Sequence, residues 1–196
     1  MKLSLSVVLL VILGGCAWTN STAIREPEFN AIRFKRCVVF ARLSDLSGRK
    51  RIENGVVTQL QLAHIQAVSS LRLFVQPPDP EVALSKFVAA GADTLLSISI
   101  DSATLSTGPT FATTTGSTTT VNTIHKPRMD FTADVTELAS GKLVWRDSVE
   151  SKGNGYANFN TTIDSFVEKV AEDIATEQLF TPGPSAEAAS ANGQPL

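Results

Sequence analysis

Two spacings of apolar residues alternate along this chain and together predict an ordered set of strands and helices. Segments rich in β-branched residues predict strands, whereas apolar residues repeated at a helical spacing predict amphipathic helices. The clearest helical stripe comprises Ile163, Phe166, Val167, Val170 and Ile174. The predicted elements are, in order, a strand over 33–43, a helix over 52–68, a strand over 71–75, a helix over 82–88, strands over 94–100, 129–138 and 142–149, and a helix over 163–179.

This order predicts an α/β (α+β) fold, a two-layer sandwich with a mixed β-sheet and helices packed mainly on one face. The last two strands are expected to form a hairpin around the turn Ala139-Ser140-Gly141. The second face of the sheet then needs either polar side chains or a partner. Asp130 and Asp134 alternate along one strand, which favours a solvated sheet face over an acid/base pair.

The first sixteen residues resemble the signal of a bacterial lipoprotein. A short apolar run from Leu3 to Leu13 is too short to span a bilayer core about 30 Å thick, and it is followed by Gly14-Gly15-Cys16. The resemblance implies removal of residues 1–15 as a signal peptide, diacylglycerol on the Cys16 sulfur, and an acyl chain such as palmitate on the new amino terminus. Ala17 stands where an inner-membrane retention signal has Asp, so we expect the outer membrane, facing the periplasm. The alternative is an amino-terminal core helix with an incidental cysteine.

The remaining chain divides by composition. We expect residues 16–30 to form a lipid-anchored tether, because this segment is polar and shows no periodicity. Residues 31–180 form the predicted α/β lipoprotein domain, which contains a Thr/Ser-rich insertion over 103–124. Residues 181–196 are rich in Pro, Ala, Ser and Gly and predict a disordered tail.

Composition and charge exclude several classes of function. The chain has 196 residues, a net charge of −2 and only two Cys and two His, so it offers no basic field for nucleic acid and too few ligands for a zinc cluster. Cys37 is expected to be a small buried strand residue. The basic run Arg49-Lys50-Arg51 is either solvated or a contact for anionic lipid or glycan. No nucleophile or phosphate motif is present, so we expect a non-enzymatic protein without metal or cofactor.

Three landmarks resemble the superfamily that contains the curli-export lipoprotein and the amino-terminal domain of TolB. The first is a strand that leads into Leu-Ser-Gly, the second a helix end with Gly-Ala-Asp before a strand, and the third a hairpin with Ser-Gly-Lys and a following Trp. They lie at 37–48, 91–100 and 135–145, and the resemblance covers about 33–180. It implies an envelope protein, and the superfamily includes ring-forming export components.

The insertion departs from the family pattern. In the curli-export channel a hairpin at this place contributes to a membrane β-barrel, but here apolar residues are few and Pro109 interrupts the segment. We therefore expect a solvated loop or a hairpin that reaches a partner. Trp145 is expected to pack against a helix, with an exposed partner contact as the alternative. The candidate partner-binding residues are Thr113, Thr114, Thr115, Thr118, Thr119, Thr120 and Trp145.

Together these features predict a lipid-anchored, periplasm-facing protein that acts as a non-enzymatic accessory module in envelope assembly or transport. Its predicted partners are the membrane, through lipid on Cys16, and an envelope protein or a second copy, with no nucleic acid. The alternative is a ring-forming subunit of an outer-membrane secretion or polysaccharide-export assembly.

Overall fold

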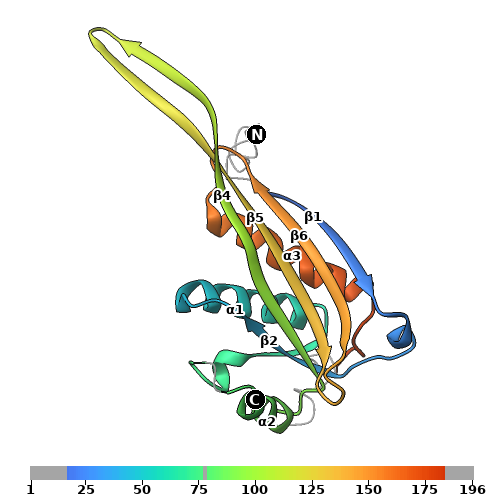
Figure 1. Ribbon diagram of the computed structural model, residues 1–196. Coiled ribbons are helices and arrows are strands. Elements are labelled where there is room, and N and C mark those ends of the chain that lie inside the picture. The colour runs from blue at the N-terminus through green and yellow to red at the C-terminus, as the bar shows by residue number, and fades with distance from the viewer. Residues whose placement is uncertain (1–16, 77–78, 184–196) are drawn as a thin grey trace, which may run out of the picture.

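The sheet contains six strands in the order β1-β6-β5-β4-β2-β3 in a computed structural model that describes residues 17–76 and 79–183 (Figure 1). Strand β2 is parallel to β3 and β4, and the other neighbours are antiparallel. This confirms the predicted mixed sheet. The elements are β1 Ala17–Arg25, η2 Pro27–Phe29, β2 Arg36–Ala41, α1 Leu46–Leu62, β3 Gln66–Ser69, η3 Ser70–Arg72, α2 Pro80–Ala89, β4 Thr94–Thr115, β5 Thr118–Glu137, β6 Leu143–Gly153 and α3 Phe159–Thr176.

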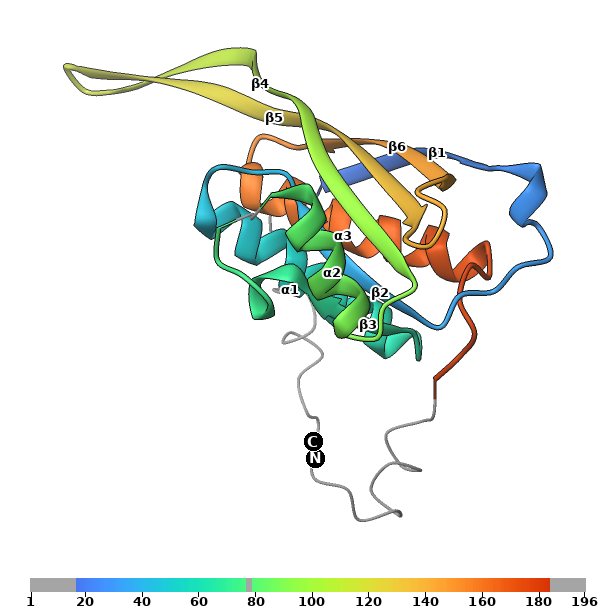
Figure 2. The ribbon, with the colours of Figure 1, turned by 60° about the horizontal axis from the view of Figure 1, so that its bottom comes forward.

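Helices α1 and α3 lie side by side across one face of the sheet and enclose the main core (Figures 1 and 2). The stripe predicted for the last helix is buried here, and Phe166 stacks on Phe131 of β5 with ring centroids 4.1 Å apart. Burial of such large apolar side chains is the main source of stability in a domain of this size. The two-layer arrangement expected from the sequence is therefore confirmed.

Helix α2 packs on the opposite face, at the end of the sheet formed by β2 and β3. Phe87 is its one buried residue, and it belongs to a small second cluster with Val38 and Ala92. The rest of this face, over β4, β5, β6 and β1, carries mainly polar and charged side chains, together with the exposed Trp18 and Ile24 on β1. We call this uncovered part the open face.

The segment 16–30, expected to be a tether, is instead largely structured. Residues Ala17–Arg25 form edge strand β1 along β6, and Phe29 is buried beyond it. Exposed and half-buried residues alternate strictly along β1. The prediction was wrong because the half-buried positions include Thr19 and Ser21, so this inward face is not apolar.

The strand predicted over 71–75 lies elsewhere. The parallel strand beside β2 is Gln66–Ser69, and residues Ser70–Arg72 form a 3₁₀ turn. Ser69 accepts a hydrogen bond from the Leu71 N–H at 3.1 Å and so caps this turn. The helix predicted over 52–68 also begins earlier, at Leu46, where Asp45 caps it by accepting from the N–H groups of Ser47 and Gly48.

The signal peptide and Cys16 fall outside the described residues, as does the tail from residue 184 onward. Residues 181–183, the beginning of the segment expected to be a disordered tail, are described. Thr181 donates its N–H to the Phe34 carbonyl at 2.7 Å. No helix within 17–76 and 79–183 is long and apolar enough to cross a membrane.

Candidate interaction surface

The Thr/Ser-rich insertion is a hairpin that projects from the sheet, so of the two forms expected from the sequence the structure has the hairpin and not the loop. β6 accompanies β5 only as far as Arg128, which pairs with Lys152. Beyond that point β4 and β5 continue as two strands alone, from the pair Leu105–Pro127 to the pair Thr115–Thr118. At about 3.3 Å per residue, this projection extends roughly 35 Å from the body (Figure 1). We call residues 105–127 the projecting hairpin.

Two local features let this sequence form strands. Gly116 begins a two-residue turn with a φ of +64°, a conformation in which glycine is favoured at the first turn position. Pro109 lies at the irregularity where the pairing register shifts between Thr107 and Thr110. Its missing N–H therefore removes no hydrogen bond from the regularly paired parts of the two strands. The threonines themselves are β-branched and favour extended backbone.

All six candidate threonines meet at the tip of the projecting hairpin, and all are exposed. Thr114 and Thr119 face each other with their hydroxyl oxygens 3.1 Å apart. The other two pairs are Thr113 with Thr120 and Thr115 with Thr118. The structure therefore brings these predicted residues together at one tip, where the Thr114–Thr119 pair lies on one face of the hairpin and the other two pairs lie on the opposite face.

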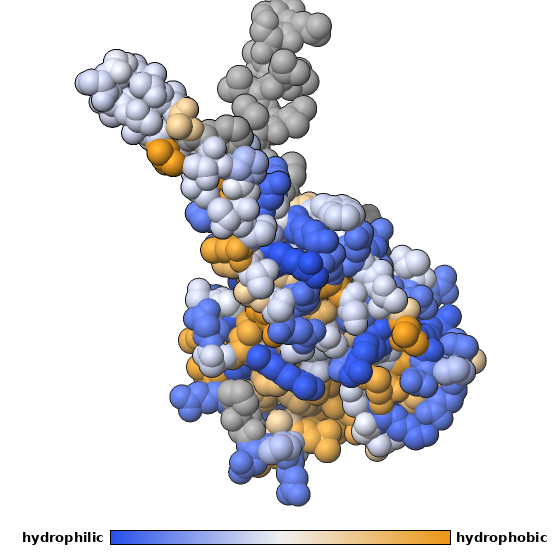
Figure 3. All heavy atoms as spheres, turned by 45° about the horizontal axis from the view of Figure 1, so that its top comes forward, coloured by the Kyte–Doolittle hydropathy of each residue, from blue (hydrophilic) through white to orange (hydrophobic). Residues whose placement is uncertain are grey.

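The projecting hairpin differs from the body in its charge. From Ser102 to Ile124 the sequence contains no Asp, Glu, Lys or Arg. In Figure 3 the hairpin is correspondingly pale, with isolated hydrophobic side chains, whereas the body is a mosaic of hydrophilic and hydrophobic residues. Leu105 and Val121 are both more than half exposed. This surface can contact a partner without removing water from any ionised group.

The base of the projecting hairpin is braced by the loop between β6 and α3. A side chain added at Gly153 would approach Pro127 to within 2.7 Å, and one added at Gly155 would collide with Ile124. The absence of a β-carbon therefore lets this loop press against both residues. Tyr156 follows directly and is 83 % exposed. Its N–H donates to the Asn154 side-chain oxygen at 3.0 Å, which fixes the backbone of the loop.

The open face carries a set of ion pairs within and between neighbouring strands. Arg146 binds Asp134 through two hydrogen bonds of 2.7 and 2.8 Å, and Glu150 receives both Arg128 and Lys152, at 2.5 and 2.6 Å. Asp130 accepts from Ser102 at 2.6 Å. The two aspartates singled out in the sequence thus lie on this face as expected, each engaged with a neighbouring side chain.

Trp145, the remaining candidate partner contact, is fully buried in the main core at 0 % exposure. A side chain with no accessible surface cannot touch a partner in this fold. The structure therefore removes Trp145 from the interaction surface and bears out packing as its role.

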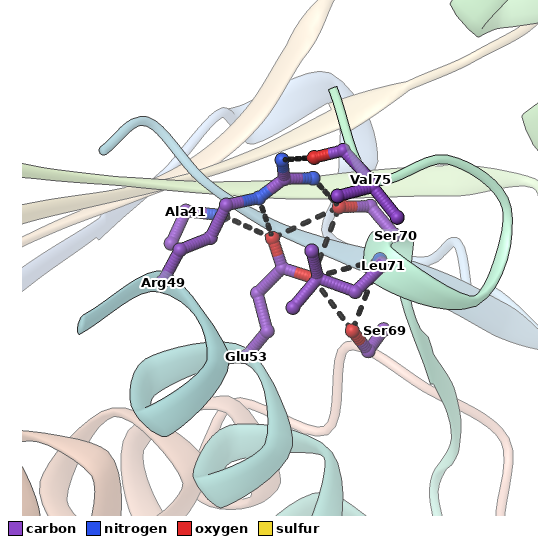
Figure 4. Close-up of polar contacts among 7 residues, drawn as sticks. All are labelled: Ala41, Arg49, Glu53, Ser69, Ser70, Leu71 and Val75. Carbon is purple, nitrogen blue, oxygen red and sulfur yellow. Dashed lines mark hydrogen bonds and ion pairs between the residues drawn. The ribbon is translucent and has the colours of Figure 1, made fainter. Parts of the chain in front are cut away.

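The basic run at the start of α1 does not form a surface patch, because Arg49 is buried with Glu53 (Figure 4). Arg49 donates to Glu53 at 2.8 Å, to the Ser70 hydroxyl at 2.7 Å and to the Val75 carbonyl at 2.8 Å. Its guanidinium also lies 5.0 Å from the centre of the Phe40 ring. A binding role for Arg49 in lipid or glycan recognition is excluded by this burial.

Glu53 is the centre of that cluster. Its carboxylate accepts hydrogen bonds from backbone N–H groups on β2 and after β3, from two serine hydroxyls and from Arg49 (Figure 4). These partners join α1 to β2, β3 and the turn η3. No local pattern in the sequence points to this cluster, since its members lie as far apart as Ala41 and Val75.

A second buried acid, Asp147 on β6, faces α3 with neither carboxylate oxygen hydrogen-bonded to a described group. Burial and then the nearby carboxylate of Asp173 raise the pKa of Asp147 to about 7, while Lys169 and the Thr22 backbone act in the opposite direction. At a pH below about 7 Asp147 is therefore expected to hold a proton, which it can donate to the facing carboxylate of Asp173.

The described residues include neither a cluster suited to a metal ion nor an accessible thiol. Within residues 17–76 and 79–183, no group of three or more His, Cys, Asp or Glu residues is placed to hold a metal ion. Cys37 is completely buried on β2, and burial raises the pKa of its thiol to about 12, so it is not a thiolate at neutral pH. A surface hollow of about 330 Å³ between the ends of α1 and α3 is lined mainly by apolar residues such as Ile65, Ile174 and Phe180.

No protein-family model matches the chain, and no curated protein sequence matches it. Solved structures with a similar fold include the PelC dodecamer of Paraburkholderia phytofirmans, at a TM-score of 0.55 and 15 % identity over 84 % of this chain and 100 % of that chain. A point variant of that dodecamer gives a TM-score of 0.50 and 14 % identity over 82 % and 98 % of the two chains.

Lipoprotein GNA1162 from Neisseria meningitidis superimposes less closely, at a TM-score of 0.43 and 13 % identity over 72 % of this chain and 98 % of that chain. At such identities the similarity to PelC establishes a shared fold and no shared activity, and the lower score of GNA1162 supports no further argument.

Proposed function

We propose that this chain is a lipid-anchored protein of the bacterial outer membrane that faces the periplasm and acts as a non-enzymatic accessory module in envelope assembly or transport. Acyl chains on Cys16 provide the anchor, because two or more such chains hold a protein on a bilayer stably. The lipobox-like sequence before Cys16 supports this step.

The observation that carries the proposal is the projecting hairpin. It extends beyond the core, and its tip presents six exposed threonines and no charge. A two-stranded ribbon in isolation is marginally stable and contributes little to the stability of the body. Its extended strand edges and uncharged side chains are suited to contact with another protein.

A ring-forming export or secretion subunit is the second candidate, and one observation favours it. The PelC structures that share this fold are dodecamers. In a ring, each subunit uses two different surfaces to contact its two neighbours. The projecting hairpin would then contact a second copy rather than an unrelated protein.

Photocrosslinking in cells distinguishes these candidates. A photoreactive amino acid is placed at Thr114 or Thr119, with Ala139, in the exposed turn before β6, as the matched control. Adducts with a different envelope protein, at the hairpin positions only, are expected for an accessory module. Adducts at multiples of the chain's own mass favour the ring, and a hairpin without any adduct contradicts both candidates.

Lipid attachment is measured separately. Radioactive palmitate should label the protein, and Cys16→Ser should abolish that label. If the unaltered protein takes up no palmitate, the anchor is wrong whatever the crosslinks show.

A further inference from the structure

We infer that the end of the domain from which the projecting hairpin rises is a membrane-contacting surface, whose occupant is a phospholipid bilayer. This inference rests on the proposed lipid anchor at Cys16. It adds an orientation: the side chains beside the hairpin base enter the interfacial layer of the membrane, and the turn before β6 faces away.

The first argument is the absence of a spacer between anchor and domain. Ala17 follows Cys16 directly and is already paired with Gly153 as the first residue of β1. Consecutive α-carbons are 3.8 Å apart, so a lipid on Cys16 holds this end of the sheet at the bilayer surface. Gly153 also contacts the hairpin base through Pro127. The anchor and the projecting hairpin therefore share one end of the molecule.

The second argument is where the exposed aromatic side chains lie. Trp18 is 60 % and Tyr156 83 % exposed, and among the aromatic residues whose exposure is described these are the two exposed ones. Both lie at this end, Trp18 one residue after Ala17 and Tyr156 beside the hairpin base. Trp and Tyr are enriched where a membrane meets water, because each ring combines an apolar body with a polar atom.

Basic side chains accompany these two rings. Lys152 lies over the Trp18 ring, with its ammonium nitrogen 5.4 Å from the ring centre. Arg128 and Lys126 follow on β5 and are exposed. Arg128 and Lys152 both bind Glu150, and Arg128 also lies 3.4 Å from a carboxylate oxygen of Asp130. Long basic side chains can extend to lipid phosphates while their methylene groups stay in the apolar layer.

The projecting hairpin is compatible with this placement. It carries no charged residue between Ser102 and Ile124, so it can lie against the interface without desolvating an ionised group. Leu105 near its base and Val121 near its tip expose apolar surface to the same layer.

Site-specific fluorescence quenching tests the inference on the full-length, lipidated protein. Tyr156→Cys and, as a control at the opposite end, Ala139→Cys are each labelled with a nitrobenzoxadiazole dye. The native Cys37 is completely buried. The proteins are reconstituted into vesicles of phosphatidylethanolamine and phosphatidylglycerol that contain lipids with nitroxide quenchers. About 35 Å of β6 separates the two positions.

The dye at position 156 should shift its emission to the blue and be quenched several-fold more than the dye at position 139. Equal, weak quenching at both positions on vesicles that carry the protein overturns the orientation and leaves the anchor intact. A protein that neither takes up palmitate nor floats with the vesicles overturns the anchor, and with it this inference.

A second variant tests the side chains themselves. Trp18→Ser with Tyr156→Ser should reduce the quenching of a dye at Thr123→Cys, beside the hairpin base, by at least twofold. Ile24→Ser, at the far end of β1, should leave it unchanged. If Trp18→Ser with Tyr156→Ser leaves the quenching at position 123 as high as Ile24→Ser does, the two rings have no role in membrane contact.

Discussion

Helices α1 and α3 pack on the same face of the sheet, and each is associated with a buried acid that has different surroundings. Glu53, on α1, and Asp147, on β6 beneath α3, are both 0 % exposed. Glu53 accepts from backbone, serine and arginine donors, whereas the two oxygens of Asp147 have no described partner. The contrast shows that burial alone does not fix the surroundings of a carboxyl group, because the hydrogen-bond donors within reach differ between the two sites.

This difference divides the body into two parts with different sensitivities. The α1 side is held by a charge that cannot lose its partners without a large cost. The α3 side contains Asp147, whose pKa is raised to about 7, and its stability should therefore respond to pH. Strand β1, which leads from the proposed anchor, belongs to the α3 side.

The largest effect should come from removing the carboxylate of Glu53. Glu53→Ala leaves Arg49 charged, buried and without its ion-pair partner, so the free energy of unfolding should fall by about 3–5 kcal/mol. Urea denaturation followed by far-ultraviolet circular dichroism measures this change.

The double variant Arg49→Met with Glu53→Leu separates charge from volume. It removes both charges and keeps apolar bulk, so it should lose clearly less stability than Glu53→Ala. If both proteins lose the same amount, the unpaired arginine is not the cause.

The next effect is the pH dependence of the α3 side. Below the ordinary pKa of 3.8, Asp147 holds a proton in both the folded and the unfolded chain. Between that value and about 7 only the folded protein keeps the proton, so the contribution of Asp147 to stability declines over this range and is lost above it. The decline should amount to roughly 2–4 kcal/mol.

Asp147→Asn isolates this contribution. An amide stays neutral and can donate to Asp173, so the variant should be more stable than the parent at pH 8 and should lack the decline between pH 4 and 7. Thermal unfolding at a series of pH values measures both. An unchanged pH profile in the variant would assign the dependence to other groups.

A smaller effect should follow from neutralising the facing acid. Asp173→Asn removes the second largest cause of the raised pKa of Asp147, so this pKa should move down toward its ordinary value. The difference in stability at neutral pH should be about 1–2 kcal/mol. Carbon-13 NMR titration of the Asp147 carboxyl group measures the pKa. Glu172→Gln is the control, since Glu172 binds Lys169 but does not act on Asp147, and it should leave the pKa in place.

The same contrast explains which elements could be predicted from the sequence. Helix α3 was predictable, because Phe166, Val170 and Ile174 repeat at a helical spacing and the structure buries them all. Strand β1 was not, because its inward side chains are polar where they meet the polar side of α3. Strand β3 was predicted at the wrong residues for a related reason. Ser69, Ser70 and the Leu71 N–H all donate hydrogen bonds to Glu53 on α1. Local periodicity cannot show such contacts with a helix that is distant in the sequence.

The interaction surface was predicted in part. The six threonines could be chosen because they are dense and uncharged, and the structure places them in one hairpin tip. That they lie on strands depended on the bulge at Pro109 and on the turn at Gly116, which together let two polar segments pair. Trp145 was a reasonable candidate by residue type alone, but no pattern in the sequence shows how deeply a strand residue is buried.

The smallest predicted effect concerns the attachment of β1 itself. The Thr19 hydroxyl lies 2.7 Å from that of Ser165 on α3 and 3.1 Å from that of Ser151 on β6. Thr19→Val should therefore cost about 1 kcal/mol and should loosen β1 locally, because one hydrogen-bonded side chain contributes that much. Hydrogen exchange should become faster at the β1 amides and unchanged in β4 and β5. Thr22→Val, on the exposed side of β1, is the control and should leave exchange unaltered. If Thr19→Val instead speeds exchange throughout the sheet, β1 unfolds together with the body, and the two parts of the molecule are not separate in stability.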